Sequence, residues 1–195
     1  MTPGPELLNR VQTAFLSRGF QKLTMEALAE ACGFTRRTLY NYFENKDAAF
    51  RAMFRQHNLE LMHRAFEVAR REQAAGAEVL DVFTALIDIR YGDTWRLIQP
   101  SPHALEIKGT VFRICTDIMI ELATVFQSDL AAFIDTLTQA GALRLKGDYS
   151  AAELAQMLAD AARGVNAVYP LLPLEHLTAQ YRRITRAILY GYLDA

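Results

Sequence analysis

Apolar residues recur along this chain at the spacing of α-helices. In the first such segment, residues 5–18, Leu8, Val11 and Phe15 share one stripe. The sequence has no sustained alternation of apolar and polar residues, and it lacks the Asn-Gly and Asp-Gly pairs that join hairpin strands. The pattern therefore predicts an all-α fold.

Capping and turn residues divide this pattern into separate helices. We expect helices over residues 5–18, 24–33, 35–42, 45–75, 78–97, 102–108, 110–126, 128–140, 150–169 and 174–193. Ser150 and Glu153 have the spacing of a capping box. We expect Gly19 to end the first helix in the left-handed conformation, so that Phe20 touches Phe15 as in a Schellman stop.

The second and third helices are short and have matching start signals. Thr24 and Thr35 are suited to cap them, and each cap is flanked by a hydrophobic staple pair, Leu23 with Leu28 and Phe34 with Leu39. Small or apolar residues stand where a helix-turn-helix needs them: Leu28, Ala29, Cys32, Gly33, Phe34 and Leu39. This segment is therefore a candidate helix-turn-helix.

The third helix keeps a polar outer side. Arg36, Arg37, Tyr40 and Asn41 remain there, where arginine can pair with guanine edges or phosphates and the others can bond to the DNA backbone or bases. Helix pairs with a glycine turn are common, however, and adjacent arginines on a short helix usually form a solvated face. The residues alone leave both interpretations open.

Residues 7–54 resemble the N-terminal domain of the tetracycline-repressor (TetR) family of bacterial transcription regulators. The segments that carry the resemblance are AFLSRGFQKLTMEALAEACGF and TRRTLYNYFENKDAAF, with their pieces in family order and at family spacing. Cys32-Gly33 replaces the more usual Ala-Gly, a change of one small residue for another. The remainder resembles the family in its helical layout and in the stretch QAGALRLKGDYSAAELAQML.

The resemblance implies a DNA-binding domain at residues 1–47 and a helical effector-binding and dimerisation domain at residues 48–195. It places Thr24, Thr35, Arg36, Arg37, Tyr40, Asn41, Tyr42 and Lys46 at positions that the family uses for DNA. Thr24 and Lys46 would hold phosphates at helix N-termini, and Arg36 and Arg37 are the candidates for base contacts. Leu39 and Phe43 should be core. The implied function is sequence-specific transcription regulation, most often repression of a palindromic operator that a small-molecule effector relieves.

The last two expected helices are apolar on more than one side. Over residues 150–169 one face carries Leu154, Met157, Leu158, Ala161, Val165 and Val168, and another carries Ala155, Ala159 and Ala162. The final helix has a stripe of Leu177, Tyr181, Ile184, Ile188 and Tyr192. The pattern alone favours a monomer core, whereas the family forms a four-helix homodimer interface from these helices.

Large apolar side chains are dense between residues 83 and 126, and we expect most of them to be core. Tyr91, Trp95, Phe112, Met119, Asn166 and Tyr169 are our candidates for an effector site, because they combine size with occasional polar groups. For Asn166 the favoured interpretation is a satisfied structural amide or an exposed position.

Charge and composition add little that is specific. The formal net charge is -1, with eight basic and five acidic residues through residue 56 (+3) and an acidic remainder (-4). No signal peptide or membrane span is evident, so we expect a cytoplasmic protein, and Cys32 and Cys115 should be reduced thiols.

Two other functional classes remain as alternatives. A helical-bundle metalloenzyme would need two Glu-x-x-His motifs, and the sequence offers one, Glu60 with His63. No nucleophile setting or phosphate-binding loop is recognisable, so we expect neither an enzyme nor a cofactor. A nucleoid-like or interaction module without an effector would also bind DNA, with a low specificity ratio.

Overall fold

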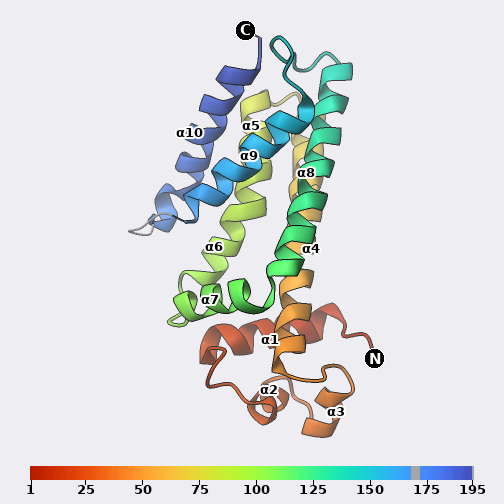
Figure 1. Cartoon of the computed structure of the whole chain (residues 1–195), viewed down its shortest axis with the longest axis vertical. Coiled ribbons are helices and arrows are strands. Elements are labelled where there is room, and N and C mark those ends of the chain that lie inside the picture. Colours follow the sequence, from red (N-terminus) through yellow and green to blue (C-terminus); the bar gives the residue numbers. More distant parts are fainter. Residues whose placement is uncertain (168–171, 195) are drawn as a thin grey trace. The chain divides into compact units, whose positions relative to one another are not determined.

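The computed structural model describes residues 1–167 and 172–194, and it confirms the all-α fold (Figure 1). The helices are α1 (Pro5–Arg18), α2 (Met25–Ala31), α3 (Arg36–Tyr40), α4 (Lys46–Ala74), α5 (Val79–Ile87), the π-helix η1 (Asp88–Gly92), α6 (Asp93–Ile98), α7 (Ala104–Ile114), α8 (Thr116–Gln139), α9 (Ala151–Val165) and α10 (Leu174–Tyr192). Within the described ranges the β-structure is one isolated antiparallel bridge between Leu145 and Leu193. None of the helices described is long and apolar enough to cross a membrane.

The chain divides into two compact units. Unit 1 consists of Met1–Glu60 and Leu97–Glu121, and unit 2 consists of Leu61–Arg96 and the chain from Leu122 onward. Unit 1 therefore contains α1 to α3, the start of α4, and α7. The functional boundary between residues 1–47 and 48–195 stays a prediction.

Three phenylalanines form the centre of unit 1. Phe15 of α1 stacks on Phe20 at 5.6 Å between ring centroids, and both meet Phe50 of α4 edge to face, at 5.0 and 5.4 Å. All three rings are buried, and such edge-to-face pairs add to the stabilisation from burial. The cluster joins α1 to α4 and fixes the loop that leads into α2.

The short helices begin as the sequence predicts. The side chains of Thr24 and Thr35 accept hydrogen bonds from the backbone amides of Ala27 and Thr38, and Ser150 forms a reciprocal capping box with Glu153. These caps satisfy amides that have no partner inside the helix.

The predicted Schellman stop is found at Gly33 and not at Gly19. After α2, the Phe34 amide donates to Ala29 O and the Gly33 amide donates to Glu30 O, the two bonds of that motif. Gly19 has φ 75° but ψ 167°, outside the left-handed helical region, and its amide donates to Phe15 O. The expected contact between Phe15 and Phe20 is nevertheless present.

Two predicted helix breaks are wrong. α7 runs through Gly109, because Ile107, Thr110 and Val111 continue one buried stripe, and it ends instead at Ile114. α8 runs through Ser128 to Gln139 for the same reason, with Phe126, Leu130 and Phe133 buried in succession. The third helix is also shorter than expected, since α3 ends at Tyr40.

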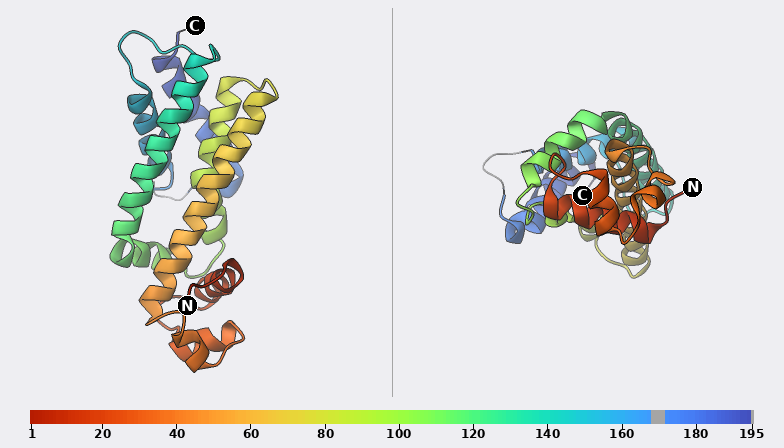
Figure 2. Two further views of the ribbon diagram at one scale, coloured as in Figure 1. Left: turned by 90° about the vertical axis from the view of Figure 1, so that its right-hand side faces the viewer. Right: turned by 90° about the horizontal axis from the view of Figure 1, so that it is seen from below.

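Unit 2 is a helical bundle. Phe66 of α4 contacts Phe126 and Phe133 of α8 at 5.6 and 6.2 Å. α10 packs along both α5 and α9 (Figures 1 and 2). The predicted regular helix over residues 78–97 instead contains the π-turn η1 between α5 and α6.

Glycine substitutions test two positions whose backbone has positive φ, one of which is also crowded. Gly19 and Gly76 both have positive φ, but a Cβ on Gly19 would lie 2.5 Å from Glu106 Oε2 and 2.7 Å from His103 Nδ1, whereas Gly76 has open space. We expect Gly76→Ala to lower the free energy of unfolding by about 1 kcal/mol and Gly19→Ala by more than about 2 kcal/mol. Gly19→Ala costs more because it adds crowding and a ψ of 167° that only glycine adopts readily. Urea unfolding measures both values, and equal losses would contradict this added cost.

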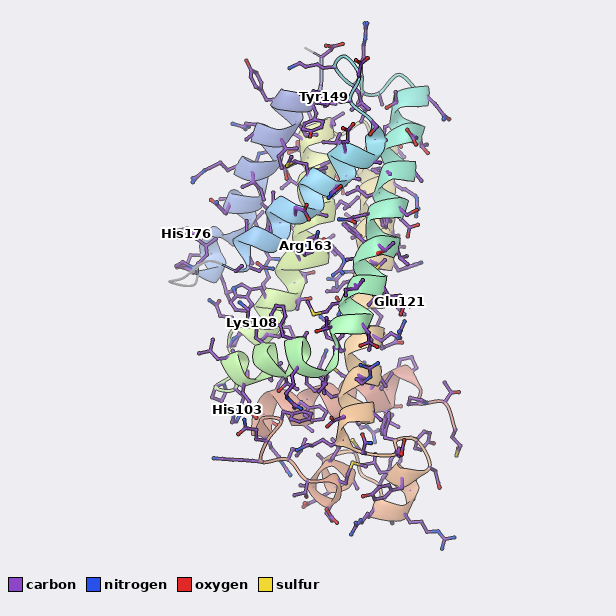
Figure 3. All side chains as sticks on the ribbon, in the orientation of Figure 1. His103, Lys108, Glu121, Tyr149, Arg163 and His176 are labelled. Carbon is purple, nitrogen blue, oxygen red and sulfur yellow. The ribbon has the colours of Figure 1, made fainter. Side chains whose placement is uncertain are left out.

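The second prediction concerns two ion pairs of unit 1. Arg51 of α4 forms a bidentate pair with Asp117, and Arg55 of α4 forms one with Glu121, both at the start of α8 and with N–O distances of 2.6–2.7 Å. Glu121 is labelled in Figure 3. The Arg51 hydrogen bond lowers the pKa of Asp117 to about 2, and the Arg55 hydrogen bond lowers that of Glu121.

Because these pKa values are lower in the folded state, the pairs stabilise the protein above about pH 4 and lose that effect as the pH falls towards 2. Acid unfolding followed by circular dichroism should therefore be less steep in an Asp117→Asn, Glu121→Gln variant. Asp148→Asn, in an exposed loop, is the control and should match the wild type. Identical pH profiles for all three proteins would contradict the prediction.

Candidate functional site

The polar face predicted for the third helix is exposed in unit 1. Thr35, Arg36, Arg37, Tyr40 and Asn41 are exposed along α3 and its C-terminal end, while Leu39 points into the core with no exposed surface. The Schellman bonds at Gly33 turn the chain between α2 and α3, so this face is fixed by the backbone.

Arg36 is oriented by its neighbours in the absence of DNA. Its Nη1 lies 2.5 Å from Glu26 Oε1, and its guanidinium carbon lies 5.5 Å from the centre of the Tyr40 ring. The hydrogen bond with Tyr40 and the charge of Glu26 raise the pKa of Arg36. Both partners are exposed, so the contacts hold the side chain only weakly.

Tyr42 and Lys46 are more enclosed than the other predicted DNA contacts. The Tyr42 ring stacks on Phe34 at 5.9 Å with an angle of 8° between planes. Lys46 Nζ donates to Phe20 O at 2.7 Å and to Gln21 O at 3.4 Å, and it lies 4.4 Å from the centre of the Phe20 ring. An ammonium has three donors, so Lys46 can still offer one to a phosphate.

Further residues support the helix-turn-helix and were not predicted. Arg10 donates to Cys32 O at 3.0 Å, and Arg18 donates to Ala27 O at 3.4 Å, so α1 holds both ends of α2. The amino group of Met1 donates to Asn41 O at 3.0 Å. Arg10 and Arg18 are eight residues apart, which puts them on one side of α1, and this spacing could have indicated their shared role from the sequence.

α7 also contacts the loop that joins α1 to α2 within unit 1. Glu106 Oε1 accepts a hydrogen bond from the Gln21 amide at 2.5 Å, and Glu106 Oε2 lies 3.3 Å from His103 Nδ1; His103 is labelled in Figure 3. Ser101 Oγ donates to Leu16 O at 2.5 Å. These contacts fix the start of the helix-turn-helix from a segment 85 residues away in sequence.

The candidate effector residues are not brought together as one group. Tyr91 and Trp95 are buried in unit 2. Met119 is half-buried in unit 1, while Tyr169 lies outside the described residues. Phe112 is 58 % exposed and Leu105 is 63 % exposed, so these two belong to the minority of this apolar set that is not core.

Both polar atoms of the Asn166 side chain have hydrogen-bond partners, in line with the structural role that the sequence analysis favours for it. Its Nδ2 donates to Tyr91 O at 3.1 Å, and its Oδ1 accepts from the Tyr181 hydroxyl at 2.7 Å. The amide thereby joins the end of α9 to η1 and α10.

The apolar stripe of α10 is used largely inside unit 2. Leu177 and Tyr181 are fully buried there, and Ile184, Ile188 and Tyr192 are half-buried. The outward faces instead present Met157 of α9, 44 % exposed, and Tyr190 of α10, 83 % exposed. Sequence periodicity identified the inner face, and only the packing distinguishes it from the outer one.

No group of three or more His, Cys, Asp or Glu residues in the described part of the chain is arranged to hold a metal ion. Glu60 accepts a hydrogen bond from Gln56 at 2.5 Å, and His63 Nδ1 lies 3.9 Å from Glu67. The Glu-x-x-His pair therefore contacts neighbouring side chains on its own helix.

Several solved structures share this fold at low sequence identity. A TetR-family transcriptional regulator described as putative, from Mesorhizobium loti, is 17 % identical with a TM-score of 0.70, covering 97 % of this chain and 96 % of its own. A TetR regulator from Haloarcula marismortui is 16 % identical with a TM-score of 0.71, covering 97 % of both chains.

SmeT, the repressor of the Stenotrophomonas maltophilia multidrug efflux pump SmeDEF, is 16 % identical with a TM-score of 0.64, covering 97 % of this chain and 89 % of its own. It also matches as a complex with triclosan, at 17 % identity and a TM-score of 0.66, covering 97 % of this chain and 90 % of its own.

No curated protein sequence matches the chain significantly. The family described as "Bacterial regulatory proteins, tetR family" matches residues 13–53, the segment from the middle of α1 to the first turns of α4 that contains the whole helix-turn-helix. Residues 13–53 are therefore similar to the DNA-binding domain of the TetR family, and the whole described chain shares its fold with solved structures of TetR-family regulators.

Proposed function

We propose that the protein is a sequence-specific DNA-binding repressor that a small-molecule effector releases from a palindromic operator. The observation that carries the proposal is the exposed polar face of α3, held in place by the Gly33 turn and by a buried Leu39. Bacterial DNA is the target, so the protein would act in the cytoplasm.

Each of the predicted contact residues has a role in this proposal. Arg36 and Arg37 read guanine edges in the major groove, with Arg36 leaving Glu26 to do so. The remaining residues position the helix on the DNA backbone: Thr24, Thr35, Tyr40, Asn41, Tyr42 and Lys46. Lys46 reaches a phosphate with the donor that Phe20 and Gln21 leave unused.

The alternatives make different predictions about DNA binding. A nucleoid-like module would show a strong salt dependence and little preference for sequence, whereas a repressor has a specificity ratio of roughly 10³ or more. Among the residues that the structure describes, no side-chain arrangement supports a catalytic role, and we propose that the protein is not an enzyme and needs no cofactor.

We further propose that the protein acts as a homodimer through the outward faces of α9 and α10. These faces combine exposed Met157 and Tyr190 with charges of opposite sign, because Asp160 on α9 and Arg186 on α10 are exposed. Such a surface is self-complementary about a two-fold axis. Two copies of α3 would then lie one helical turn of DNA apart, about 34–36 Å.

Effector release needs a ligand that binds better to a form with weaker DNA affinity. A tenfold loss of DNA affinity requires about 1.4 kcal/mol of coupling, and DNA must weaken the ligand by the same factor. We place the effector site in unit 2 near Tyr91, Trp95 and Asn166; the exposure of Phe112 and the place of Met119 in unit 1 make these two weaker candidates. The triclosan complex of SmeT supports a small, largely apolar ligand.

Arginine substitutions on α3 test the proposed recognition. An operator is first selected from random-sequence DNA with the wild-type protein, and its affinity is then measured by fluorescence anisotropy. Arg36→Ala and Arg37→Ala should each weaken operator binding by about 1–3 kcal/mol and relax the preference at one base position. Removing a charge at a position that contacts only phosphate would instead weaken binding to all DNA sequences alike.

The control for this experiment is Arg144→Ala, which removes an exposed arginine of unit 2 that pairs with Asp194. It should bind the operator like the wild type. If the folded double variant Arg36→Ala, Arg37→Ala keeps wild-type affinity and sequence preference, α3 is not the reading helix.

The dimer is tested by charging its proposed outer face. Met157→Lys with Tyr190→Lys should weaken dimerisation at least tenfold, measured by sedimentation equilibrium, because two lysines from each protomer would be buried at the interface. Both residues are exposed in the protomer, so its thermal stability at low concentration should change little. Leu59→Lys, another exposed apolar residue, is the matched control, and a wild-type protein that is monomeric at micromolar concentration would refute the interface.

A further inference from the structure

A buried arginine of unit 2, Arg90, lies in the π-turn η1. Arg90 is 8 % exposed, and the turn Asp88–Gly92 that carries it interrupts an otherwise continuous helical segment from α5 to α6. Single π-turns within helices occur frequently at functional sites, because they change the direction in which side chains point. A buried cation in such a turn is therefore a candidate for a binding role.

Aromatic rings surround the guanidinium. Its central carbon lies 5.0 Å from the centre of the Tyr91 ring and 5.3 Å from that of the Phe126 ring, and these rings meet edge to face at 5.7 Å. Rings stabilise a desolvated cation through their faces. They also form an apolar wall beside it.

Two guanidiniums and one carboxylate act on this site, because Arg90, Arg163 and Asp160 all affect the pKa of Tyr91. Burial lowers the pKa of Arg90, Tyr91 raises it, and the guanidinium of Arg163 lowers it. Burial raises the pKa of Tyr91, against the opposite effects of Arg90 and Arg163. Arg163, labelled on α9 in Figure 3, contacts Asp160 on its own helix.

The Tyr91 hydroxyl supplies an additional donor. It is buried, and it has no hydrogen-bond partner among the described residues. Arg163 is close enough to lower the pKa of Tyr91 without forming a hydrogen bond of normal geometry to that hydroxyl. Buried hydroxyls normally have a partner, so this one points to a group that the protein alone does not supply.

We propose that Arg90 and the Tyr91 hydroxyl bind the carboxylate of a small organic acid whose apolar part packs on the Tyr91 and Phe126 rings. A guanidinium and a hydroxyl are the donors that a carboxylate takes. The inference rests on the proposed function, since it assigns a chemical class to the effector of unit 2.

Burial of Arg90 also explains how such a ligand acts. An anion reaches a guanidinium that is 8 % exposed only when the side chains around it move. Binding therefore selects an altered packing of η1, α8 and α9, and a ligand with different affinities for two packings shifts the balance between them.

The test uses two probe series that differ in charge at constant shape. Decanoate is compared with decanamide and decylamine, and benzoate with benzamide and benzylamine, by calorimetric titration and by the shift in melting temperature of the full-length protein. At least one carboxylate should bind at least tenfold more tightly than its amide, and the amines should not stabilise the protein.

Substitutions at the site make the assignment specific. Arg90→Met should reduce the advantage of the carboxylate over its amide to less than twofold, Arg90→Lys should keep part of it, and Tyr91→Phe should reduce it about three- to tenfold. Arg70→Met is the matched control, because Arg70 is an exposed arginine that lies 5.7 Å from the centre of the Phe66 ring. It should leave the preference unchanged.

Two results would overturn the proposal. In the first, no carboxylate binds the wild-type protein more tightly than its amide does. In the second, Arg90→Met and Arg90→Lys both fold, and Arg90→Met keeps the wild-type preference for the carboxylate. Measuring operator affinity with and without the carboxylate distinguishes a failure of this binding site from a failure of the proposed function. Selective, Arg90-dependent carboxylate binding that leaves operator affinity unchanged would keep the site and refute effector release. Failure of the unliganded protein to select any operator would refute the repressor itself, whatever binds at Arg90.

Discussion

The organisation of unit 1 depends on the contact of Phe15, Phe20 and Phe50. These rings come from the end of α1, the loop after it and the first turns of α4, so their packing fixes the chain direction on entry to the helix-turn-helix. Gly19 allows this arrangement, because its backbone conformation lets Phe20 turn back onto Phe15. The cluster of Phe15, Phe20 and Phe50 therefore positions the exposed face of α3, although none of the residues of that face belongs to the cluster.

The elements predicted well are those that depend on neighbouring residues. Caps at Thr24, Thr35 and Ser150 are local hydrogen bonds between residues three positions apart, and the sequence contains everything that they require. The false break at Gly109 shows the limit of this reasoning. Glycine weakens a helix, but the buried stripe on either side of it stabilises α7, and burial is a property of the folded chain.

The features of the candidate site also divide into those that follow from local sequence and those that depend on tertiary packing. The outward direction of Arg36 and Arg37 follows from helical periodicity once Leu39 is assigned to the core. The binding of Lys46 to the Phe20 and Gln21 carbonyls, across about 25 residues, depends on tertiary packing and has no local signal. Periodicity likewise shows that α10 is apolar along one stripe, but it does not show whether a neighbouring helix or a second subunit covers that stripe.

The π-turn in unit 2 has a consequence for how this segment tolerates changes in length. A π-turn contains one residue more than a regular helical turn, and one residue corresponds to a rotation of about 100° along an α-helix. Removing a single residue between Asp88 and Gly92 would therefore restore a regular helical turn with little rotation of α5 relative to Trp95 and the rest of α6, whereas removing a residue from a regular turn of α5 or α6 would rotate the flanking faces by that angle. Within this segment, the π-turn is the place where a change of one residue in chain length least disturbs which side chains face the interior of the bundle.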